Sequence, residues 1–333
     1  MAEAATRIAL DAMGGDHAPS VVVEGAIAAA REYGVEVILV GPREQVQQEL
    51  ARHDSSGLKI PIAHAEEVVG MEEHAATALR QKRHSSIAIG IGLVREGQAD
   101  GFVSAGNSGA VLAAALFGLG RIEGIERPAI GTVYPTSTGR CFIVDAGANV
   151  DCRPEYLAQF ALMGSAYMER VFGVTNPRVA LLSNGEEETK GNSLVQGCHP
   201  LLKASQLNFV GNVEGKDVPL GMADVVVCDG FAGNVVIKLS EGLASALFDI
   251  LKTELTAGFV SKLAAMALKP AFRRVKRRLD YAEYGGAPLL GVKGITIIAH
   301  GRSNALAIKN AVRVAKQAVD QKLVDAIKAG LAP

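Results

Sequence analysis

Asparagine, serine and glycine gather in short segments of this 333-residue chain, each directly after a run of apolar residues. Seven of the ten asparagines lie in such segments: Asn107, Asn149, Asn184, Asn192, Asn212, Asn234 and Asn304. Asn and Ser side chains and glycine N–H groups are neutral donors, and a helix N-terminus adds partial positive charge. This combination suits a phosphate-like oxyanion. Turn formation explains any one of these segments equally well, but explains the repeated composition poorly.

The candidate site residues come from these segments and from two nearby histidines. The candidate catalytic residues are Asn107, Asn149, Asn184, Lys190, His17 and His300. The candidate binding residues for substrate or phosphate are Asp11, Gly14, Gly15, Asp16, Ser104, Gly106, Ser108, Gly109, Asp145, Asn192, Asn212, Asp229, Asn234 and Ser303. We expect Asn107, Asn149 and Asn184 to act on the bound anion or the transition state rather than on folding. Lys190 follows three glutamates, so a solvated ion pair suits it as well as anion binding does.

Other kinds of chemistry lack their sequence signals. The chain has no GxxxxGK[ST] phosphate loop and no GxGxxG dinucleotide fingerprint. It has no HExxH or HxH pair, and its four cysteines form no CxxC pair. We therefore expect no metal and no cofactor.

Ser108 raises the question of a serine nucleophile. The run from Gly106 to Ala110 (GNSGA) resembles a loose nucleophile elbow, but its fifth residue is not glycine. A serine at a helix start is more often a cap. Direct attack by phosphate, which is already an anion at neutral pH, agrees better with loops rich in Asn.

Apolar runs that alternate with helical patterns predict the elements that hold these loops. The predicted strands are 7–11, 35–40, 58–63, 100–104, 129–133, 141–145, 179–183, 207–210, 224–228 and 295–299. The predicted helices are 20–33, 75–96 with a break, 109–119, 155–171, 233–251 and 304–329. This order indicates a doubly wound α/β fold with a mostly parallel sheet covered by helices on both faces. We predict one domain over 1–333, with a helical projection at about 240–283, and all seven loops at one edge of the sheet.

Composition narrows the class of protein further. The net charge is −1 and aromatic residues make up 5%, which argues against a dedicated nucleic-acid-binding protein. The first residues lack the long apolar run of a signal peptide, and widely spaced cysteines suit a reducing compartment. We therefore expect a cytoplasmic location.

A basic stretch stands apart from the loops. Leu251, Leu255, Phe259 and Leu263 recur every four residues and predict one helix stripe, which Pro270 interrupts. Six basic residues without an acid follow in 269–278: Lys269, Arg273, Arg274, Lys276, Arg277 and Arg278. A solvated helix face, an acidic protein partner and an anionic membrane surface all remain open for this stretch.

Eight segments in order carry a family resemblance. They are DAMGGDHAP (11–19), SAGNSGA (104–110), DAGANVD (145–151), LLSNGEEETKGN (181–192), GNVEGKD (211–217), DGFAGN (229–234), EYGGAPLLGVKG (283–294) and HGRSN (300–304). Together they resemble the bacterial phosphate acyltransferases of phospholipid synthesis over nearly the whole chain. The family more often has Thr at the position of Ser108, and both residues carry a hydroxyl.

The resemblance implies a reaction and partners. It implies transfer of a long-chain acyl group from acyl carrier protein to inorganic phosphate, which gives an acyl phosphate for a membrane glycerol-3-phosphate acyltransferase. It also implies a homodimer, peripheral association with the inner face of the cell membrane, and a fold similar to phosphate acetyltransferase and isopropylmalate dehydrogenase. Three alternatives remain: a phosphate acetyltransferase-like enzyme that uses acyl-CoA, a decarboxylating dehydrogenase, and a non-catalytic scaffold at the membrane surface.

Overall fold

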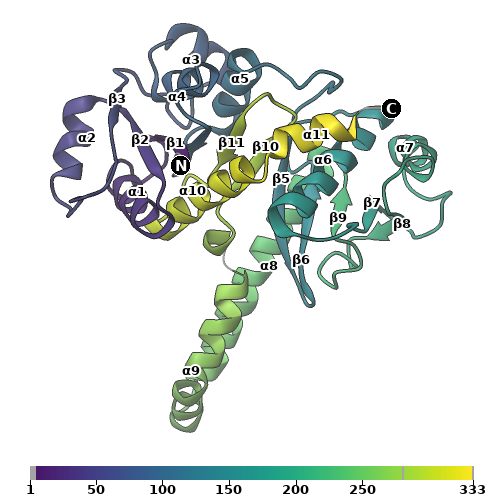
Figure 1. The fold of residues 1–333 in the computed structure, drawn as a ribbon. Helices are drawn as coiled ribbons and strands as arrows, with labels where there is room; N and C mark the ends of the chain where they lie inside the picture. The colour runs from purple at the N-terminus through teal and green to yellow at the C-terminus, as the bar shows by residue number, and fades with distance from the viewer. Residues whose placement is uncertain (1–4, 280, 332–333) are drawn as a thin grey trace.

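One eleven-stranded sheet organises the chain (Figure 1). The computed structural model describes residues 5–279 and 281–331. The strand order is β3-β2-β1-β4-β11-β10-β5-β6-β9-β7-β8. Most neighbouring strands are parallel, as the sequence predicts, and helices cover both faces of the sheet.

The first half of the sheet consists of parallel strands with their connecting helices. Its strands are β1 (Arg7–Asp11), β2 (Glu36–Gly41), β3 (Ile62–His64), β4 (Gly101–Ser104) and β11 (Ile295–Ile298). Its helices are α1 (Ser20–Tyr33), α2 (Arg43–Leu50), α3 (Ala75–Gln81), α4 (Ser86–Arg95), α5 (Ser108–Gly118) and α10 (Ala305–Asp320). The last helix, α11 (Leu323–Gly330), follows α10 and packs on α6 (Pro154–Phe172) of the second half. Side chains alternate along β1: Ile8 and Leu10 join the core beneath α1 and α10, and Ala9 joins the core beneath α4 and α5.

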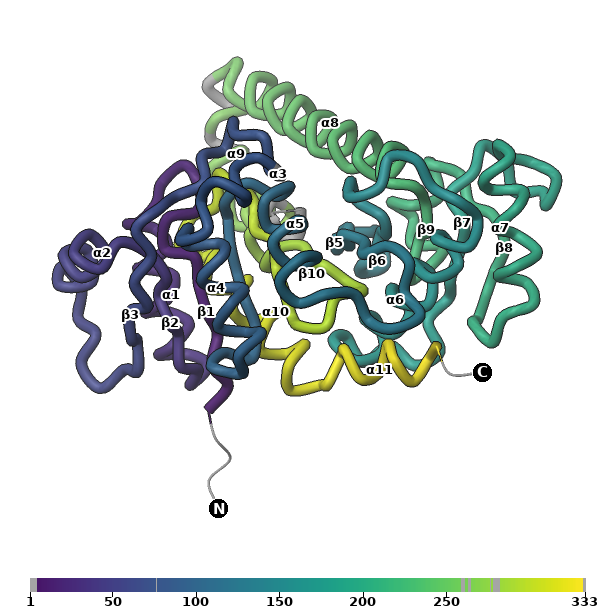
Figure 2. Tube along the Cα trace, turned by 90° about the horizontal axis from the view of Figure 1, so that it is seen from above, coloured from purple at the N-terminus to yellow at the C-terminus, as the bar shows by residue number. Residues whose placement is uncertain are grey.

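The second half is also parallel within itself but carries a different set of helices. Its strands are β6 (Gly139–Val144), β9 (Val225–Val227), β7 (Val179–Ser183) and β8 (Phe209–Glu214). Its helices are α6 (Pro154–Phe172), α7 (Ser193–Lys203) and the first turns of α8 (Gly230–Thr256). Figure 2 shows α8 and α11 on opposite sides of the central strands.

Two antiparallel strands at the centre reverse the direction of the sheet. β10 (Ala287–Leu290) is antiparallel to both β11 and β5 (Ala129–Thr136), and β5 is antiparallel to β6. The carboxyl ends of β1, β4 and β11 therefore lie at one edge, and those of β6, β7, β8 and β9 at the opposite edge. The expectation that all seven loops share one edge is wrong for this reason.

Helices α8 and α9 (Phe259–Leu279) extend away from the sheet as a helical hairpin, followed by a short 3-10 helix η1 (Tyr281–Glu283) (Figure 1). The predicted single stripe from Leu251 to Leu263 is divided, because α8 ends at Thr256 and α9 begins at Phe259. The predicted interruption at Pro270 is also wrong, since α9 continues through this residue. In an exposed helix, water can satisfy the carbonyl that proline leaves without a donor.

Several element boundaries differ from the sequence prediction. The third strand begins at Ile62 rather than at residue 58, and the predicted helix 304–329 is two helices. Lys322, with a φ of 51°, separates α10 from α11. Helices α2 and α7 and strand β10 were not predicted, whereas α9 lies within the predicted helical projection at about 240–283.

The core around β5 and β6 leaves no room for a side chain at Gly131. A Cβ at Gly131 would lie 1.9 Å from Cζ of Phe142, which is fully buried and stacks on Tyr167 at 4.4 Å between ring centroids. We predict that Gly131→Ala lowers the free energy of unfolding by about 1–3 kcal/mol through overpacking. Urea denaturation measures the change.

Gly242→Ala is the matched control for this prediction. Gly242 lies in exposed α8, where an added Cβ meets no atom within 4 Å. The same substitution should there raise stability by about 0.5–1 kcal/mol through helix propensity. A neutral or stabilising Gly131→Ala would contradict the packing described for β5 and β6.

Candidate active site

Asp11 joins the loops that follow β1 and β4. Its buried carboxylate accepts a hydrogen bond from Ser104 Oγ at 2.7 Å and one from the Met13 N–H at 3.0 Å. Ser104 Oγ in turn accepts from the Gly106 N–H at 3.0 Å. Burial raises the pKa of Asp11, and these hydrogen bonds oppose that rise. Asp11 and Ser104 thus hold the two loops together.

Close backbone approach explains two glycines in the first of these loops. A Cβ at Gly14 would lie 2.6 Å from the Gly106 nitrogen, and one at Gly15 would lie 2.9 Å from the Gly301 carbonyl oxygen. The Asp16 N–H donates to that same carbonyl at 2.8 Å. Three predicted segments, 11–19, 104–110 and 300–304, therefore meet at one edge of the sheet.

Asn107 uses its side chain within the protein. Its Oδ1 accepts from the Ala110 N–H at 3.0 Å and caps α5. Its Nδ2 donates to the carbonyl oxygens of Met71 and Glu73, each at 3.0 Å. Asn107 therefore orients α5 and fixes the segment before α3, and an additional action on substrate remains a proposal.

Asp145 organises the second group of loops in the same way. Its buried carboxylate accepts hydrogen bonds from the N–H groups of Ile130, Gly147 and Asn149 at 2.6–3.1 Å. Asn149 Nδ2 donates to Asp145 and to the Pro128 carbonyl, both at 2.8 Å. Burial raises the pKa of Asp145, and its hydrogen bonds oppose the rise. These contacts give Asn149 a structural role.

The remaining predicted polar residues of the second group lie around a smaller cavity of about 360 Å³. Asn184, Asn192 and Asp229 line it. Asn192 caps α7 and Asp229 caps α8, while Asn184 Oδ1 accepts from the Gly191 N–H at 2.9 Å. Asn212 lies behind this group and donates to the Glu187 carbonyl at 2.9 Å.

A second cavity, of about 400 Å³, lies where the two halves of the sheet meet, and we call it the central cleft. Four predicted residues line it: Ser108, Asn234, His300 and Ser303. They come from α5, α8 and the loop between β11 and α10. Short β10 and the start of β5 form its floor through Ala287, Ile130 and Thr132. The central cleft is therefore the place where loops from both sheet edges converge.

The sequence prediction missed the charged residues of α8 in the central cleft. Lys238 and Glu241 line it, and their side chains form an ion pair at 3.2 Å. Arg302 Nη2 lies 3.8 Å from the Glu241 carboxylate. Lys238 and Glu241 follow Asn234 by four and seven residues, so they share its helix face. This spacing from Asn234 is the sequence signal that could have placed Lys238 and Glu241 at the site.

His300 and Ser303 give the central cleft its reactive polar atoms. Burial lowers the pKa of His300, and the positive charges of Arg302 and Lys238 lower it further. The negative charges of Glu241 and Asp16 oppose this shift by raising the pKa. His300 is therefore neutral at neutral pH. Ser303 is buried, and its Oγ has no hydrogen-bond partner within the described residues. A ligand in the cleft can supply that partner.

An apolar groove continues from the central cleft under α8. This groove, of about 400 Å³, shares Thr132, Val133, Ile237, Glu241 and Tyr284 with the cleft. It continues past Pro135, Pro219 and Ala244 to Val275 of α9. A polar cleft that opens into an apolar groove matches a ligand with a polar reacting end and a long apolar tail.

Comparison with known proteins identifies the family. The family model "Fatty acid synthesis protein" matches residues 6–326. "Phosphate acyltransferase" of Pelotomaculum thermopropionicum is 54% identical over 325 residues, 98% of this chain and 95% of the relative. The protein of the same name from Geobacter sulfurreducens is 51% identical over 323 residues, 96% of this chain and 93% of its own. The chain belongs to the phosphate acyltransferase family.

Solved structures of more distant proteins share the fold. A phosphotransacetylase from Streptococcus pyogenes is 17% identical with a TM-score of 0.65, covering 95% of this chain and 94% of its own. A branched-chain phosphotransacylase from Enterococcus faecalis is 14% identical with a TM-score of 0.59, covering 94% and 99%. These likenesses support the three-layer α/β architecture and the fold class predicted from the sequence.

Some predicted residues of this phosphate acyltransferase family member lie outside the central cleft. Asp16, His17 and Lys190 are exposed and do not line it. Gly109, in the first turn of α5, is also exposed, and an added Cβ would lie 3.1 Å from Ala75. Catalytic or binding roles for these residues remain proposals.

The lowered pKa of His300 predicts the pH dependence of the enzyme. If neutral His300 accepts a proton during turnover, kcat/KM falls as the pH drops through that lowered pKa, below 6.5. Arg302→Gln removes a cation that lowers this pKa, so it should move the acidic limb toward higher pH. A kcat/KM profile from pH 5 to 9 measures the limb. Unchanged limbs in Arg302→Gln and His300→Gln would exclude His300 as the titrating group.

Proposed function

We propose that this enzyme transfers a long-chain fatty acyl group from acyl carrier protein to inorganic phosphate and forms acyl phosphate for phospholipid synthesis. Membership of the phosphate acyltransferase family supports phosphate as the acceptor. The observation that carries the proposal is the continuity of the polar central cleft with the apolar groove under α8, which we call the acyl groove. The cleft suits phosphate and the thioester carbonyl, and the groove suits the acyl chain.

Helix termini and cations favour phosphate in the central cleft. The first residue of α5, Ser108, and the residue before the cap of α10, Ser303, both line it. N–H groups at helix N-termini bind anions, and Lys238 adds a cation. Buried Ser303 Oγ can donate to a phosphate oxygen. Asn234 supplies a further neutral donor from α8.

The reaction needs no enzyme nucleophile in this arrangement. A phosphate oxygen attacks the thioester carbonyl, the new C–O bond forms, and the C–S bond breaks. Neutral His300 accepts the phosphate proton and returns it to the departing thiolate of the carrier. Donors at the α5 and α10 N-termini stabilise the oxyanion that develops on the carbonyl oxygen of the thioester. The cleft holds the two reactants in place, which supplies a large part of the rate.

Helix α8 carries a stripe that supports a homodimer. Phe231, Val235, Leu239, Leu243 and Leu247 recur every four residues and are 49–69% exposed. An exposed apolar stripe of this length on a helix is typical of a surface that another chain covers. We place the dimer contact on α8, at the helix that also supplies Asn234 and Lys238 to the cleft.

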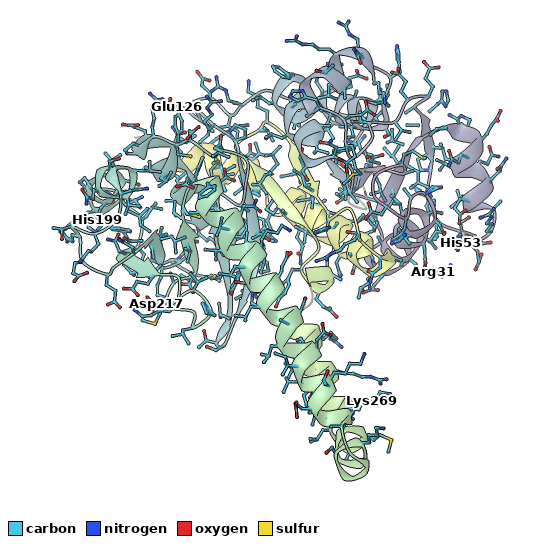
Figure 3. All side chains as sticks on the ribbon, turned by 180° about the vertical axis from the view of Figure 1, so that it is seen from behind. Arg31, His53, Glu126, His199, Asp217 and Lys269 are labelled. Carbon is cyan, nitrogen blue, oxygen red and sulfur yellow. The ribbon has the colours of Figure 1, made fainter. Side chains whose placement is uncertain are left out.

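The basic residues of α9 support contact with an anionic partner. Lys269, Arg273, Arg274 and Arg277 are exposed, and Arg277 pairs with Glu283 at 3.1 Å. Figure 3 places Lys269 on the hairpin, away from the α/β body. The side chains of Lys276 and Arg278 lie outside the described residues, as do those of Phe259 and Leu263. Within the described part, no helix has the length and apolar character to cross a membrane.

The proposed contacts define where the enzyme works. We propose that the α9 residues bind acyl carrier protein or the anionic inner face of the cell membrane. There the product can pass to a glycerol-3-phosphate acyltransferase. Exposed Met266 and Leu268 beside these cations add apolar surface that suits shallow insertion into a bilayer.

The first test is the reaction itself, with Ser108→Ala beside the wild type. Palmitoyl carrier protein should release free carrier thiol only when phosphate is present. Ser108→Ala should retain at least about a tenth of the wild-type rate, because its hydroxyl is not the nucleophile. Thiol release is followed with a thiol reagent, and mass spectrometry searches for an acyl adduct. An adduct on Ser108 would refute direct attack, and turnover with palmitoyl-CoA alone would favour a coenzyme A-dependent enzyme.

The second test reverses charge on α9. Arg273 and Arg274 form no ion pair within the described residues, so Arg273→Glu/Arg274→Glu removes only exposed charge. We predict weaker use of the carrier protein or weaker flotation with anionic vesicles, and the loss should diminish at high salt, where screening weakens both proteins. Lys59→Glu/Lys293→Glu, at exposed positions on the α/β body, is the matched control. If both double variants behave alike in both assays, the basic residues of α9 form only a solvated helix face and the proposed contact with an anionic partner is wrong.

A further inference from the structure

A large groove lies on the face of the first half of the sheet, apart from the central cleft. It has a volume of about 780 Å³ and runs between α3, α4 and α5. Its lining residues lie within 79–96 and 113–118. It shares none of them with the central cleft or the acyl groove. Its size is within the range of about 300–1,000 Å³ of small-molecule sites.

The walls of this groove are apolar along most of their length. Ile89, Gly92 and Leu93 come from α4, and Ala113 and Phe117 from α5. Phe117 is 81% exposed, so its ring adds apolar surface at the edge of the groove. The apolar walls favour a hydrocarbon chain, and Phe117 can cover such a chain at the edge.

The charge at one end of the groove is positive. Arg80 and Arg83 form no ion pair and no hydrogen bond within the described residues, whereas Arg95 pairs with Glu96 at 3.0 Å. Glu96 is the one acid among the lining residues and is therefore already compensated. The two arginines leave a net positive rim, which fits a carboxylate or phosphate group.

We propose that this groove is a second binding site for a long-chain acyl ligand with an anionic head group. The hydrocarbon chain lies along α4 and α5, and the head group contacts Arg80 and Arg83. A fatty acid carboxylate and an acyl phosphate share this chemistry. The site is independent of the proposed reaction, because none of its residues belongs to the central cleft.

Helix α5 connects the two sites physically. Its first residue, Ser108, lines the central cleft, and its last residue, Gly118, lines the groove. At 1.5 Å per residue, its eleven residues separate the two by about 15 Å. A ligand in the groove therefore packs on the helix whose N-terminus faces the candidate active site.

Gly92 offers a way to fill the groove without disturbing the fold. A Cβ at Gly92 would meet no atom within 4 Å, so a side chain there enters open space. Gly92→Leu should occupy part of the groove, and Gly92→Ala should leave most of it open while giving the same gain in helix propensity. Thermal melts should place both variants at or above the wild type.

The experiment measures binding of palmitate and of hexadecylphosphonate by titration calorimetry. We expect Gly92→Leu to bind one equivalent fewer than Gly92→Ala. A diazirine-bearing palmitate should crosslink to residues 79–118 in the wild type and in Gly92→Ala, but at least tenfold less in Gly92→Leu. The affinities of palmitate and hexadecylphosphonate show whether the site prefers a carboxylate or a phosphate-like head group. Equal stoichiometry and equal crosslinking in both glycine variants would overturn the proposal.

A charge variant tests the head group separately. Arg80→Glu/Arg83→Glu should weaken binding of palmitate at this site at least tenfold, whereas Lys59→Glu should not. Hexadecanol, which has the same chain without the charge, should bind the wild type more weakly than palmitate. Equal affinity for palmitate and hexadecanol, or no effect of the double variant, would refute recognition of an anionic head. If the protein binds palmitate at this site but shows no phosphate-dependent turnover, the proposed reaction is wrong and the second binding site is unaffected.

Discussion

The antiparallel pairings of β10 with β11 and β5, and of β5 with β6, are the constraint on which the rest of the structure depends. Because three antiparallel pairings separate the two parallel halves of the sheet, the halves run in opposite directions. Loops at the carboxyl ends of β4 and β11 then reach the central cleft from one side, and loops after β6 and β9 reach it from the other. A fully parallel sheet would place all of these loops along one edge.

Two buried aspartates repeat one structural device at these opposite edges. Asp11 ends β1, Asp145 directly follows β6, and both lie almost fully out of water. Asp11 accepts hydrogen bonds from the Met13 N–H in the loop that follows and from Ser104 of β4, and Asp145 accepts several from the loop that follows it. A carboxylate can remain in such a place only when N–H and O–H donors compensate its lost hydration. Much of the polar composition of the loops therefore fixes their shape. The groups left for a ligand are those of α8 and of the 300–303 loop.

The sequence was sufficient to predict most of the individual strands and loops, but not which of the loops meet at the central cleft. The strands 7–11 and 179–183 agree with the structure residue by residue, because each is a short apolar run with a polar end. β10 escaped because its sequence, APLL, follows two glycines and contains Pro288, which reads as a turn. Without β10 the reversal cannot be inferred. Lys238 and Glu241 were not predicted as site residues because a charged helix face is usually solvated. Only the fold shows that both residues line the central cleft.

The central cleft also explains why the loops contain no convincing nucleophile and base pair. Its ionisable groups are His300, which is kept neutral, Tyr284, Lys238 and Glu241, and Glu241 lies close to Lys238 and to Arg302 beside the cleft. A buried serine or cysteine nucleophile would need an adjacent base, and the buried thiol of Cys228 has its pKa raised by burial and by Asp145 and Asp229. Phosphate carries its own negative charge, so the protein needs only to orient it, neutralise it and accept one proton. In the proposed reaction the acyl group is held by apolar contacts, and the groove under α8 has the apolar walls that such contacts require.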